Sequence, residues 1–430
     1  MIHSNFCLEN SNSEYDQKRL LQEFKRVRKQ TISIIDGLSE EDMTVQSMDD
    51  ASPTKWHLAH TTWFFETFIL EKYKNNYKLF NKAFKQLFNS YYKQIGSQHP
   101  RPIRGLLTRP NLNQVMNYRS QVDNAISELI TNADKRSNYL GLIELGIIHE
   151  QQHQELIFTD ILHLFSKNPL SPAWKQTKTF NDSDVNSNKW IHFPGNTYSI
   201  GHSGDSFGFD HEGPEHKVII PDFKISNTLV TNGQWLEFIE NSGYQRPEFW
   251  LSDGWDIKTN NGWTCPEYWC QNDNKWMHMT LCGMESIKPN APVCHVSYYE
   301  ADAFARWSGN RLPTEVEWEI ASQNSHSSNN TLGSEFYKPL PAAYEDNTHI
   351  MNQMFGDVWE FTQSSFSPYP GFKAVNGAIG EYNGKFMSNQ MVLRGASCVT
   401  PDNHSRKTYR NFFYPSQRWQ FTGLRLASDL

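Results

Sequence analysis

The sequence predicts a two-domain α+β protein, in which a four-helix bundle precedes a domain of short strands and helices. A chain of 430 residues exceeds what one hydrophobic core usually supports, so two domains are expected. Helical periodicity runs through the first part and gives way after Trp190 to short segments rich in Gly, Pro and aromatic residues. We therefore expect a helical domain at 1–166, a polar linker at 167–188 and an α+β domain at 189–430.

Four segments of the first domain have helical character. Residues 17–38 place apolar side chains on roughly one face of a helix. A second helix is expected to open at Ser52-Pro53, with the serine as its cap and the proline in the first turn. Residues 112–131 and 138–165 supply the others. Bundles of this kind build metal sites from inward-facing side chains on neighbouring helices.

The second domain is predicted from short apolar segments between turns. Strands are expected in PGNTYSIG and HKVIIPDFKIS, and helices at 297–307 and 314–322. The motifs GNRLPTEVEWE, FGDVWEFT, LRGAS and TGLRLA combine aromatic, charged and glycine residues without a catalytic grouping. We interpret four of their charged residues as buried ion-pair scaffolding: Arg311, Glu315, Arg394 and Arg425.

Composition excludes several classes of function. The net charge of −7 and the lack of a basic block argue against a nucleic-acid surface. No run approaches the ~18 apolar residues that a membrane span needs, and the N-terminus does not resemble a signal peptide. The six cysteines are therefore expected to be reduced thiols in a cytoplasmic protein.

The strongest local motif is IIHEQQHQEL. His149 and His153 are four residues apart on a predicted helix, so both imidazoles project from one face. That geometry suits two ligands of one metal ion, although a pair of core or solvated histidines would have the same spacing.

HEQQH also satisfies the H-E-x-x-H pattern of zinc proteases, in which Glu150 would be the general base. Such a protease needs a third ligand downstream. Glu155 is too close, and Asp160 and His163 fit neither common spacing.

A second pair of histidines lies upstream in WHLAHTTWFFE. His57 and His60 are three residues apart on a facing helix of the same bundle. A third neutral imidazole from this helix would complete a three-histidine set with open positions for substrate sulfur and dioxygen on iron(II). Histidines alone do not select iron over zinc or copper.

The 77–110 segment has little periodicity and is expected to be a loop that reaches a functional site. Its tyrosine pair, Tyr91 and Tyr92, could donate a proton or a hydrogen bond. Arg101 and Arg104 offer permanent charge suited to a small carboxylate. Surface tyrosines and solvent-facing arginines are the alternative.

Near the C-terminus, YRNFFYPSQRWQF contains Asn411 beside Phe412 and Phe413. Aromatic faces next to polar groups could hold a quaternary ammonium ion through cation–π attraction. Core packing is the commoner use of adjacent phenylalanines.

These motifs together resemble a known family. SPTKWHLAHTTWFFET and HEQQHQEL resemble a DinB-like metal-binding bundle, and PVCHVSYYEADAFARWSGNRLPTEVEWE, GDVWEFT and LRGAS…GLRLA resemble a formylglycine-generating-enzyme (C-type-lectin-like) domain. In this order, over nearly the whole chain, they resemble the ergothioneine-biosynthesis sulfoxide synthases. A zinc protease would explain none of the C-terminal half.

The resemblance implies O2-dependent coupling of a cysteine-type thiol to imidazole C2 of hercynine (Nα-trimethylhistidine), without an organic cofactor. The implied iron(II) ligands are His60, His149 and His153, with His57 outside the ligand set. Gln152 matches a position that contacts the substrate imidazole. Asn411 with its two phenylalanines matches the part that holds the trimethylammonio-carboxylate end.

Two departures from one branch of the family concern the thiol. Relatives that use γ-glutamylcysteine carry an acidic residue where this chain has Phe413, and a catalytic tyrosine where it has Phe366. The branch that uses L-cysteine has a tyrosine pair matching Tyr91-Tyr92. In that branch Arg101 and Arg104 become candidates for the cysteine carboxylate.

Other readings remain open at this stage. Selenoneine synthase and 5-histidylcysteine sulfoxide synthase are sister activities, and the usual C-terminal methyltransferase domain of the latter is missing from this sequence. A zinc metalloprotease and a non-catalytic, metal-binding DinB-like stress protein are more remote.

Overall fold

The computed structural model describes residues 16–134, 137–176, 178, 189–204, 206–325, 330–343, 350–374 and 378–430. The chain divides into two compact units. The helical unit comprises Met1–Leu170 and Lys373–Tyr382, and the mixed unit comprises Ser171–Phe372 and Asn383–Leu430. Most of the linker expected at 167–188 lies outside the described residues.

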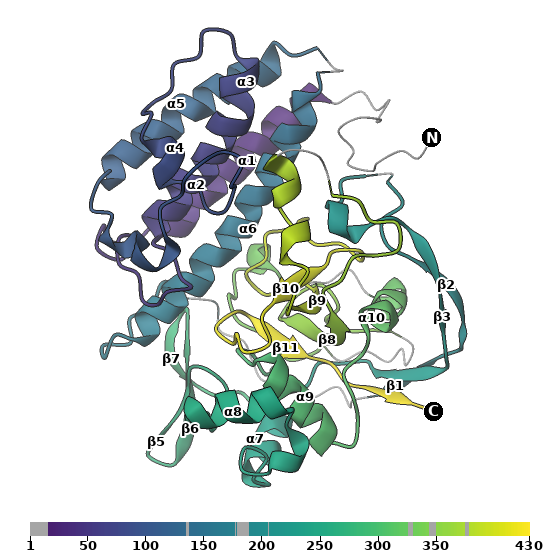
Figure 1. The fold of residues 1–430 in the computed structure, drawn as a ribbon. Coiled ribbons are helices and arrows are strands. Elements are labelled where there is room, and N and C mark those ends of the chain that lie inside the picture. The colour runs from purple at the N-terminus through teal and green to yellow at the C-terminus, as the bar shows by residue number, and fades with distance from the viewer. Residues whose placement is uncertain are drawn as a thin grey trace. The chain divides into compact units, whose positions relative to one another are not determined.

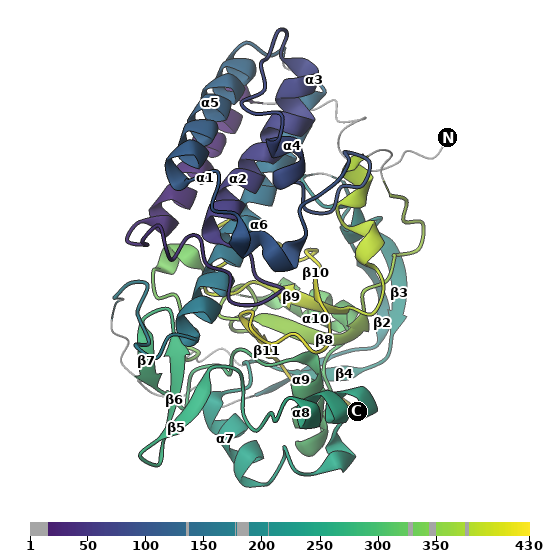
Figure 2. The same ribbon diagram turned by 60° about the vertical axis from the view of Figure 1, so that its left-hand side comes forward.

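Four long helices form the bundle of the helical unit and run alongside one another in both ribbon views (Figures 1 and 2). Helices α1 and α2 each pack against α5 and α6. The predicted helices are confirmed, and the third has the expected bounds. The four helices are α1 (Gln17–Ile35), α2 (Thr54–Phe65), α5 (Leu112–Thr131) and α6 (Tyr139–Ser166).

Helix α2 continues through a π-helical turn, η1 (Glu66–Leu70), into α3 (Glu71–Tyr73). Such turns are rare and are found frequently at functional sites. The buried Glu66 carboxylate accepts hydrogen bonds from the hydroxyls of Tyr77 and Tyr118, which ties the following loop to the bundle.

The expectation that Ser52 caps α2 is wrong. Pro53 is the N-cap residue, and no side chain caps the helix. The backbone N–H of Ser52 instead donates to Oδ2 of Asp160 on α6, and its hydroxyl accepts from Arg104. Tertiary partners have therefore replaced the local cap.

The expected 77–110 loop contains two short helices, α4 (Phe84–Leu87) and the 3-10 helix η2 (Arg101–Leu106). Gln46 holds η2 in place, because its side chain accepts from the N–H of Gly105 and donates to the carbonyl of Arg101. A Cβ atom at Gly105 would lie 2.7 Å from Cβ of Gln46, so a larger residue would displace this turn.

The mixed unit contains a four-stranded sheet in the order β10-β9-β8-β11, in which β11 pairs with β8 in parallel (Figure 1). A three-stranded sheet has the order β1-β4-β12, and β2-β3 and β5-β6-β7 are separate sheets. The strands are β1 (Trp190–Phe193), β2 (Asn196–Ile200), β3 (His216–Ile220), β4 (Phe223–Ser226), β5 (Trp269–Asn272), β6 (Lys275–Thr280), β7 (Gly283–Ser286), β8 (Trp359–Ser365), β9 (Met391–Gly395), β10 (Asn411–Phe413), β11 (Thr422–Leu424) and β12 (Ala427–Asp429).

Helices α9 (Tyr298–Trp307) and α10 (Glu315–Ala321) confirm the two helices predicted in this part. Two more, α7 (Asn232–Glu240) and α8 (Ser252–Asn260), were not predicted. Thr231 and Gln234 form a capping box at the start of α7, so a local signal for this helix was present. Six 3-10 helices complete the described elements of this unit and of the 373–382 segment: η3 (Asp210–Glu212), η4 (Pro247–Phe249), η5 (Ser322–Asn324), η6 (Leu332–Ser334), η7 (Ala378–Glu381) and η8 (Gly384–Phe386).

Buried ion pairs occur in the mixed unit, as the sequence predicted for Glu315, Arg394 and Arg425, whereas Arg311 is only partly buried. Arg425 bonds Glu360 and Arg394 bonds Glu319, and both arginines are fully buried. The Glu315 carboxylate accepts from Arg410, and the partly exposed Arg311 pairs with Glu317. Every one of these pairs has direct hydrogen bonds, which is what makes buried charge tolerable.

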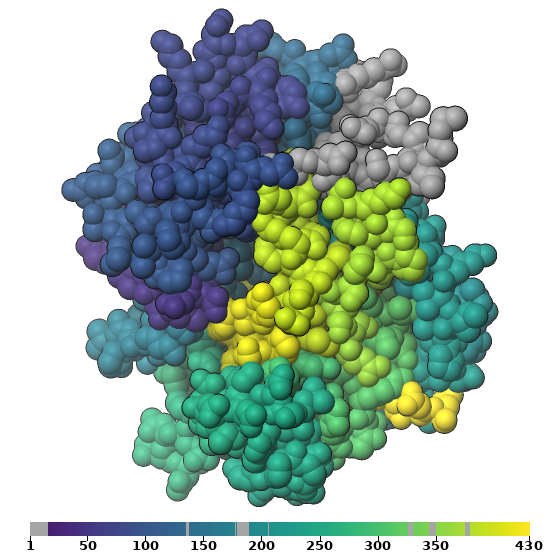
Figure 3. All heavy atoms as spheres, in the orientation of Figure 1, coloured from purple at the N-terminus to yellow at the C-terminus, as the bar shows by residue number. Residues whose placement is uncertain are grey.

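The 373–382 segment comes from the C-terminal half of the sequence but belongs to the helical unit. Its described residues include η7, whose Glu381 accepts from the backbone N–H groups of Lys93 and Gln94. In Figure 3 the helices of the N-terminal half are drawn in purple to blue, and the C-terminal part of the chain in yellow-green to yellow. Within the described ranges, no helix is long and apolar enough to cross a membrane.

Candidate metal centre

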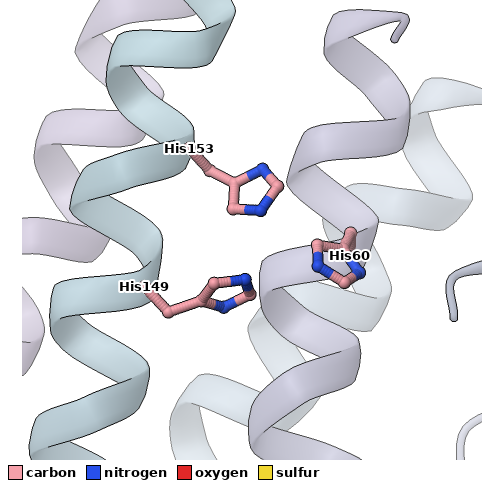
Figure 4. Close-up of side chains that lie close together, drawn as sticks. All are labelled: His60, His149 and His153. Carbon is pink, nitrogen blue, oxygen red and sulfur yellow. The ribbon is translucent and has the colours of Figure 1, made fainter. Parts of the chain in front are cut away.

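Three histidines converge inside the helical unit. His149 and His153 lie one turn apart on α6, and His60 projects toward them from α2 (Figure 4). One ring nitrogen from each lies within 4.8 Å of the others, and all three side chains are buried. Among the described residues, this is the group of histidine, cysteine and carboxylate side chains that could hold a metal ion.

Burial keeps these imidazoles neutral. It lowers the pKa of His149 to about 3, and it lowers the pKa of His60 and of His153 well below the ordinary value. The neighbouring imidazoles add to the decrease for His60 and His153. Neutral imidazole is the form that binds a metal ion.

Packing fixes the orientation of His60. Its Nδ1 donates to the carbonyl oxygen of Phe88 at 2.6 Å, which leaves Nε2 available toward the other two rings. The ring is stacked between the indoles of Trp56 and Trp63, with centroid distances of 4.6 and 5.4 Å.

Nδ1 of His149 is buried without a hydrogen-bond partner among the described residues. An unpartnered nitrogen in a group of three neutral imidazoles fits a metal ion held by three protein ligands with open positions for other molecules.

The outer partner of His153 is His57, at 2.7 Å between their Nδ1 atoms. His57 in turn contacts Oδ2 of Asp160 through Nε2 at 2.9 Å. The sequence pattern suggested Asp160 only as a metal ligand, at an unsuitable spacing. Asp160 lies two turns after His153 on the same face of α6, and this spacing could have indicated that the two residues act together.

Glu150 does not face the metal centre as a free base. Its fully buried carboxylate accepts from Arg28 at 2.6 Å, Thr31 at 2.6 Å and Arg119 at 2.9 Å. Burial would raise the pKa of Glu150, but the two guanidinium groups and these hydrogen bonds lower it to about 2. A carboxylate held by two guanidinium groups with a pKa of about 2 is a poor general base, which argues against the metalloprotease hypothesis.

The tyrosine pair lies in the helical unit and contacts Trp63, whose indole stacks on His60. The rings of Tyr91 and Tyr92 stack at 4.6 Å, and that of Tyr92 lies 5.7 Å from Trp63. Burial raises the pKa of Tyr91 to about 12 and raises that of Tyr92 well above its usual value. Both phenols therefore keep their protons at neutral pH.

Sequence reasoning missed Tyr382. Its ring lies 5.6 Å from that of His149, and its hydroxyl donates to Oε1 of Gln152. Its carbonyl oxygen accepts from the Tyr91 hydroxyl at 3.4 Å. No local pattern around Tyr382 indicated this, because its partners come from a segment more than 200 residues away.

The two loop arginines have different surroundings. The Arg104 guanidinium is buried 3.4 Å above the Trp56 ring and donates to Ser52, while its Nε has no partner in the part of the chain that the structure describes. Burial, with the charge of Arg101, lowers the pKa of Arg104 to about 8. Arg101 is half-exposed and lies 3.9 Å from Asp50. An anion bound beside Arg104 would offset the cost of burying its charge.

Asn411, Phe412 and Phe413 lie in the mixed unit, on β10, and pair with β9. The Phe412 ring stacks on Phe366 at 4.2 Å, and the Asn411 side chain accepts from the N–H of Phe412. The residues expected to hold metal, thiol and proton thus belong to the helical unit, and those expected to hold the cationic end belong to the mixed unit.

Family models match both parts of the chain. The sulfatase-modifying factor enzyme 1-like domain matches residues 176–430, and the DinB superfamily matches residues 23–157. These matches confirm the predicted fold class, a helical DinB domain followed by an α+β domain.

Curated relatives match up to 94% of the chain. A hercynine oxygenase of Mycolicibacterium thermoresistibile is 29% identical over 94% of this chain and 93% of its own length. The hercynine oxygenase of Mycolicibacterium smegmatis is 32% identical over 66% and 71%. Ergothioneine biosynthesis protein 1 of Schizosaccharomyces pombe is 24% identical over 52% of this chain and 28% of its own. The chain is therefore an enzyme of the hercynine oxygenase family, with a DinB domain followed by a sulfatase-modifying factor enzyme 1-like domain.

Proposed function

We propose that this enzyme joins the thiol of L-cysteine to imidazole C2 of hercynine, with O2 as oxidant and iron(II) as cofactor, to give hercynylcysteine sulfoxide in ergothioneine biosynthesis. The observation that carries the proposal is the group of three buried, neutral imidazoles in a chain similar to hercynine oxygenases over 94% of its length.

The reaction balances without another reductant. The C2–H and S–H bonds break and a C–S bond forms, while one oxygen atom of O2 enters the sulfoxide and the other leaves as water. When bound to His60, His149 and His153, iron(II) would supply the activation of O2 and a Lewis-acidic position that favours thiolate.

Arg104 is the group best placed to hold the cysteine carboxylate. Its buried guanidinium lies 3.4 Å from the centre of the Trp56 ring, and the His60 ring stacks on the same indole at 4.6 Å. A carboxylate bound there would bring the thiol of a small amino acid close to the three imidazoles. The half-exposed Arg101 would add charge from the loop surface.

Tyr91 and Tyr92 are the candidate proton donors. Both phenols are buried and protonated at neutral pH, and the Tyr92 ring packs on Trp63, which stacks on His60. Gln152 would contact the substrate imidazole, since it lies on α6 beside His153 and its amide bonds Tyr382.

Two phenylalanines support L-cysteine as the thiol. Phe366 has no hydroxyl where the γ-glutamylcysteine branch has a tyrosine, and it is stacked on Phe412 in the mixed unit. Phe413, on β10, is uncharged where the γ-glutamylcysteine branch has an acidic residue. Asn411, Phe412 and Phe413 would bind the trimethylammonio-carboxylate end of hercynine, the phenylalanines through their ring faces.

The test is product analysis after aerobic incubation of iron-loaded protein with hercynine and, in parallel, L-cysteine or γ-glutamylcysteine. Mass spectrometry should find the sulfoxide mainly with L-cysteine, and proton NMR should show loss of the C2–H signal. The variant His149→Ala should bind no iron and form no product.

Other outcomes would favour other activities. Attachment at another imidazole carbon would favour the 5-histidylcysteine activity, and turnover only with a selenium donor would favour the selenoneine activity. Zinc content without oxygen uptake would exclude an oxygenase.

A further inference from the structure

We propose that His57 is a positioning residue that makes Nε2 the metal-binding nitrogen of His153, and that Asp160 holds His57 in the tautomer this requires. The inference rests on the metal centre of the proposed function, but it does not depend on which thiol or imidazole is the substrate.

Three side chains form a continuous line across the α2–α6 interface. Nδ1 of His153 lies 2.7 Å from Nδ1 of His57, and Nε2 of His57 lies 2.9 Å from Oδ2 of Asp160. His57 and His153 are buried, and the Asp160 side chain is 10% exposed. Solvent therefore has little access to these hydrogen bonds.

Each of these two hydrogen bonds contains one proton, and the Asp160 carboxylate determines which nitrogen is the donor in each. A carboxylate oxygen accepts hydrogen bonds, so Nε2 of His57 donates to Oδ2 of Asp160. In a neutral imidazole, Nδ1 of His57 is then the acceptor, and it receives the N–H of Nδ1 from His153. His153 is left with an unprotonated Nε2, which can bind a metal ion.

Hydrogen bonds in the opposite direction would prevent Nε2 of His153 from binding a metal ion. If Nδ1 of His57 donated to His153, the neutral His153 ring would carry its proton on Nε2. That nitrogen has no lone pair for a metal ion while it is protonated. Asp160 thus acts on the ligand through two rings, as carboxylates do in carboxylate–histidine–metal arrangements.

The backbone holds Asp160 in place for this role. Its Oδ2 also accepts from the N–H of Ser52, at 2.8 Å, and Oδ1 lies 3.4 Å from the hydroxyl of Thr159. Ser52 precedes α2, the helix that carries His57, so the same carboxylate joins the start of α2 to α6.

The ligands His60 and His153 have different outer partners. Nδ1 of His60 donates to the carbonyl of Phe88, and Nδ1 of His153 contacts Nδ1 of His57. Replacing His57 should therefore affect His153 and leave the outer hydrogen bond of His60 in place.

The variants separate positioning from packing. His57→Phe removes both hydrogen bonds and should weaken binding of Co(II) and Fe(II) by about 10- to 100-fold, as expected for loss of an outer partner of a ligand. His57→Asn keeps an oxygen that can accept from Nδ1 of His153, so it should recover part of the affinity. Asp160→Leu should resemble His57→Phe.

A matched control is available on the same helix. His163 is a buried histidine of α6 whose Nδ1 bonds the hydroxyl of Ser47 at 2.7 Å. His163→Phe should cost packing and the hydrogen bond to Ser47, yet leave metal affinity within about twofold of the parent protein, because interactions remote from the ligands affect mainly stability.

The readout is metal titration of the full chain without substrate, combined with proton NMR of the Co(II) form. The parent protein should show hyperfine-shifted, exchange-protected imidazole N–H signals from His60 and His153. His57→Phe should lose the protection of the His153 signal and keep that of His60. Parent-like Co(II) affinity and unchanged N–H signals in His57→Phe would overturn the inference, as would an equal loss of affinity in His163→Phe.

These outcomes are independent of turnover. If the parent protein binds iron but forms no sulfoxide from hercynine, the proposed function fails and the metal titrations still decide the role of His57. If sulfoxide forms and the titrations of His57→Phe match the parent, only the inference fails.

Discussion

The hydroxyl group of Tyr382 donates a hydrogen bond to Oε1 of Gln152, although the two residues are 230 positions apart in the sequence. The Tyr382 ring also lies 5.6 Å from that of His149. A residue from the C-terminal half of the chain therefore belongs to the surroundings of the metal centre within the helical unit.

The variant Tyr382→Phe should lower kcat/KM for hercynine by roughly 10-fold, which corresponds to one hydrogen bond of about 1.4 kcal/mol. The hydroxyl orients the Gln152 amide, whereas the ring that packs on His149 is retained. Steady-state kinetics with iron-loaded protein measures the effect. Iron content should be unchanged, and Tyr73→Phe, whose ring packs only against Tyr139 among the aromatic contacts described, is the control. Unchanged kinetics in Tyr382→Phe would show that its hydroxyl is not needed.

Glu381 should hold the tyrosine loop in place. Its two carboxylate oxygens accept from the backbone N–H groups of Lys93 and Gln94, directly after the tyrosine pair. In Glu381→Ala we expect hydrogen exchange of these two amides to be about 10-fold faster, because local opening loses both acceptors. Mass-spectrometric hydrogen exchange of peptides covering this loop measures it.

Glu381→Gln is the matched comparison for that experiment. The amide keeps one acceptor oxygen, so exchange at Lys93 and Gln94 should fall between the parent and Glu381→Ala. Equal protection in all three proteins would mean that other contacts hold the loop.

Glu150 should contribute to stability rather than to hydrolysis. Glu150→Gln leaves Arg28 and Arg119 buried without their shared carboxylate, and breaking such a pair costs about 3–5 kcal/mol of unfolding free energy. Urea unfolding measures this. The exposed pair Arg26–Glu23 offers the control Glu23→Gln, for which a change below about 0.5 kcal/mol is expected. Full stability of Glu150→Gln would contradict the structural role.

The same carboxylate predicts a pH dependence. The pKa of Glu150 is about 2 in the folded protein against 4.5 for an ordinary glutamate, so the folded state binds its proton less readily than the unfolded state. The stabilisation is complete above pH 4.5 and is lost as the pH falls toward 2. Over that window the unfolding free energy of the parent should fall more steeply than that of Glu150→Gln.

Arg104 and Arg101 should differ in their effect on cysteine binding. Arg104→Met should raise KM for L-cysteine by roughly 10- to 100-fold, since a hydrogen-bonded charge pair in a buried site is worth about 1.5–3 kcal/mol. Arg101→Ala should raise it less than about fivefold, because its side chain is half-exposed. Initial-rate kinetics at saturating hercynine compares them. A larger effect at Arg101 would place the carboxylate on the loop surface instead.

Much of the helical unit could be predicted from periodicity. The bounds of α5 were predicted as they stand, and the spacing of His149 and His153 required both rings to share a face of α6. Local sequence signals predicted less where tertiary contacts compete with them. Serine is a common helix-capping residue, yet the backbone N–H of Ser52 bonds Asp160 and its hydroxyl bonds Arg104.

The sequence by itself determined the two-part fold, the paired histidines and the family, because helix periodicity and contiguous motifs are properties of neighbouring residues. Only the tertiary structure decided that Glu150 lies in an ion-pair network, that Asp160 reaches His153 through His57, and that Tyr382 joins the metal centre. These relationships join residues that are far apart along the chain, and their energies depend on burial and on the direction of each hydrogen bond. Neither quantity is encoded in the spacing of residues along one helix.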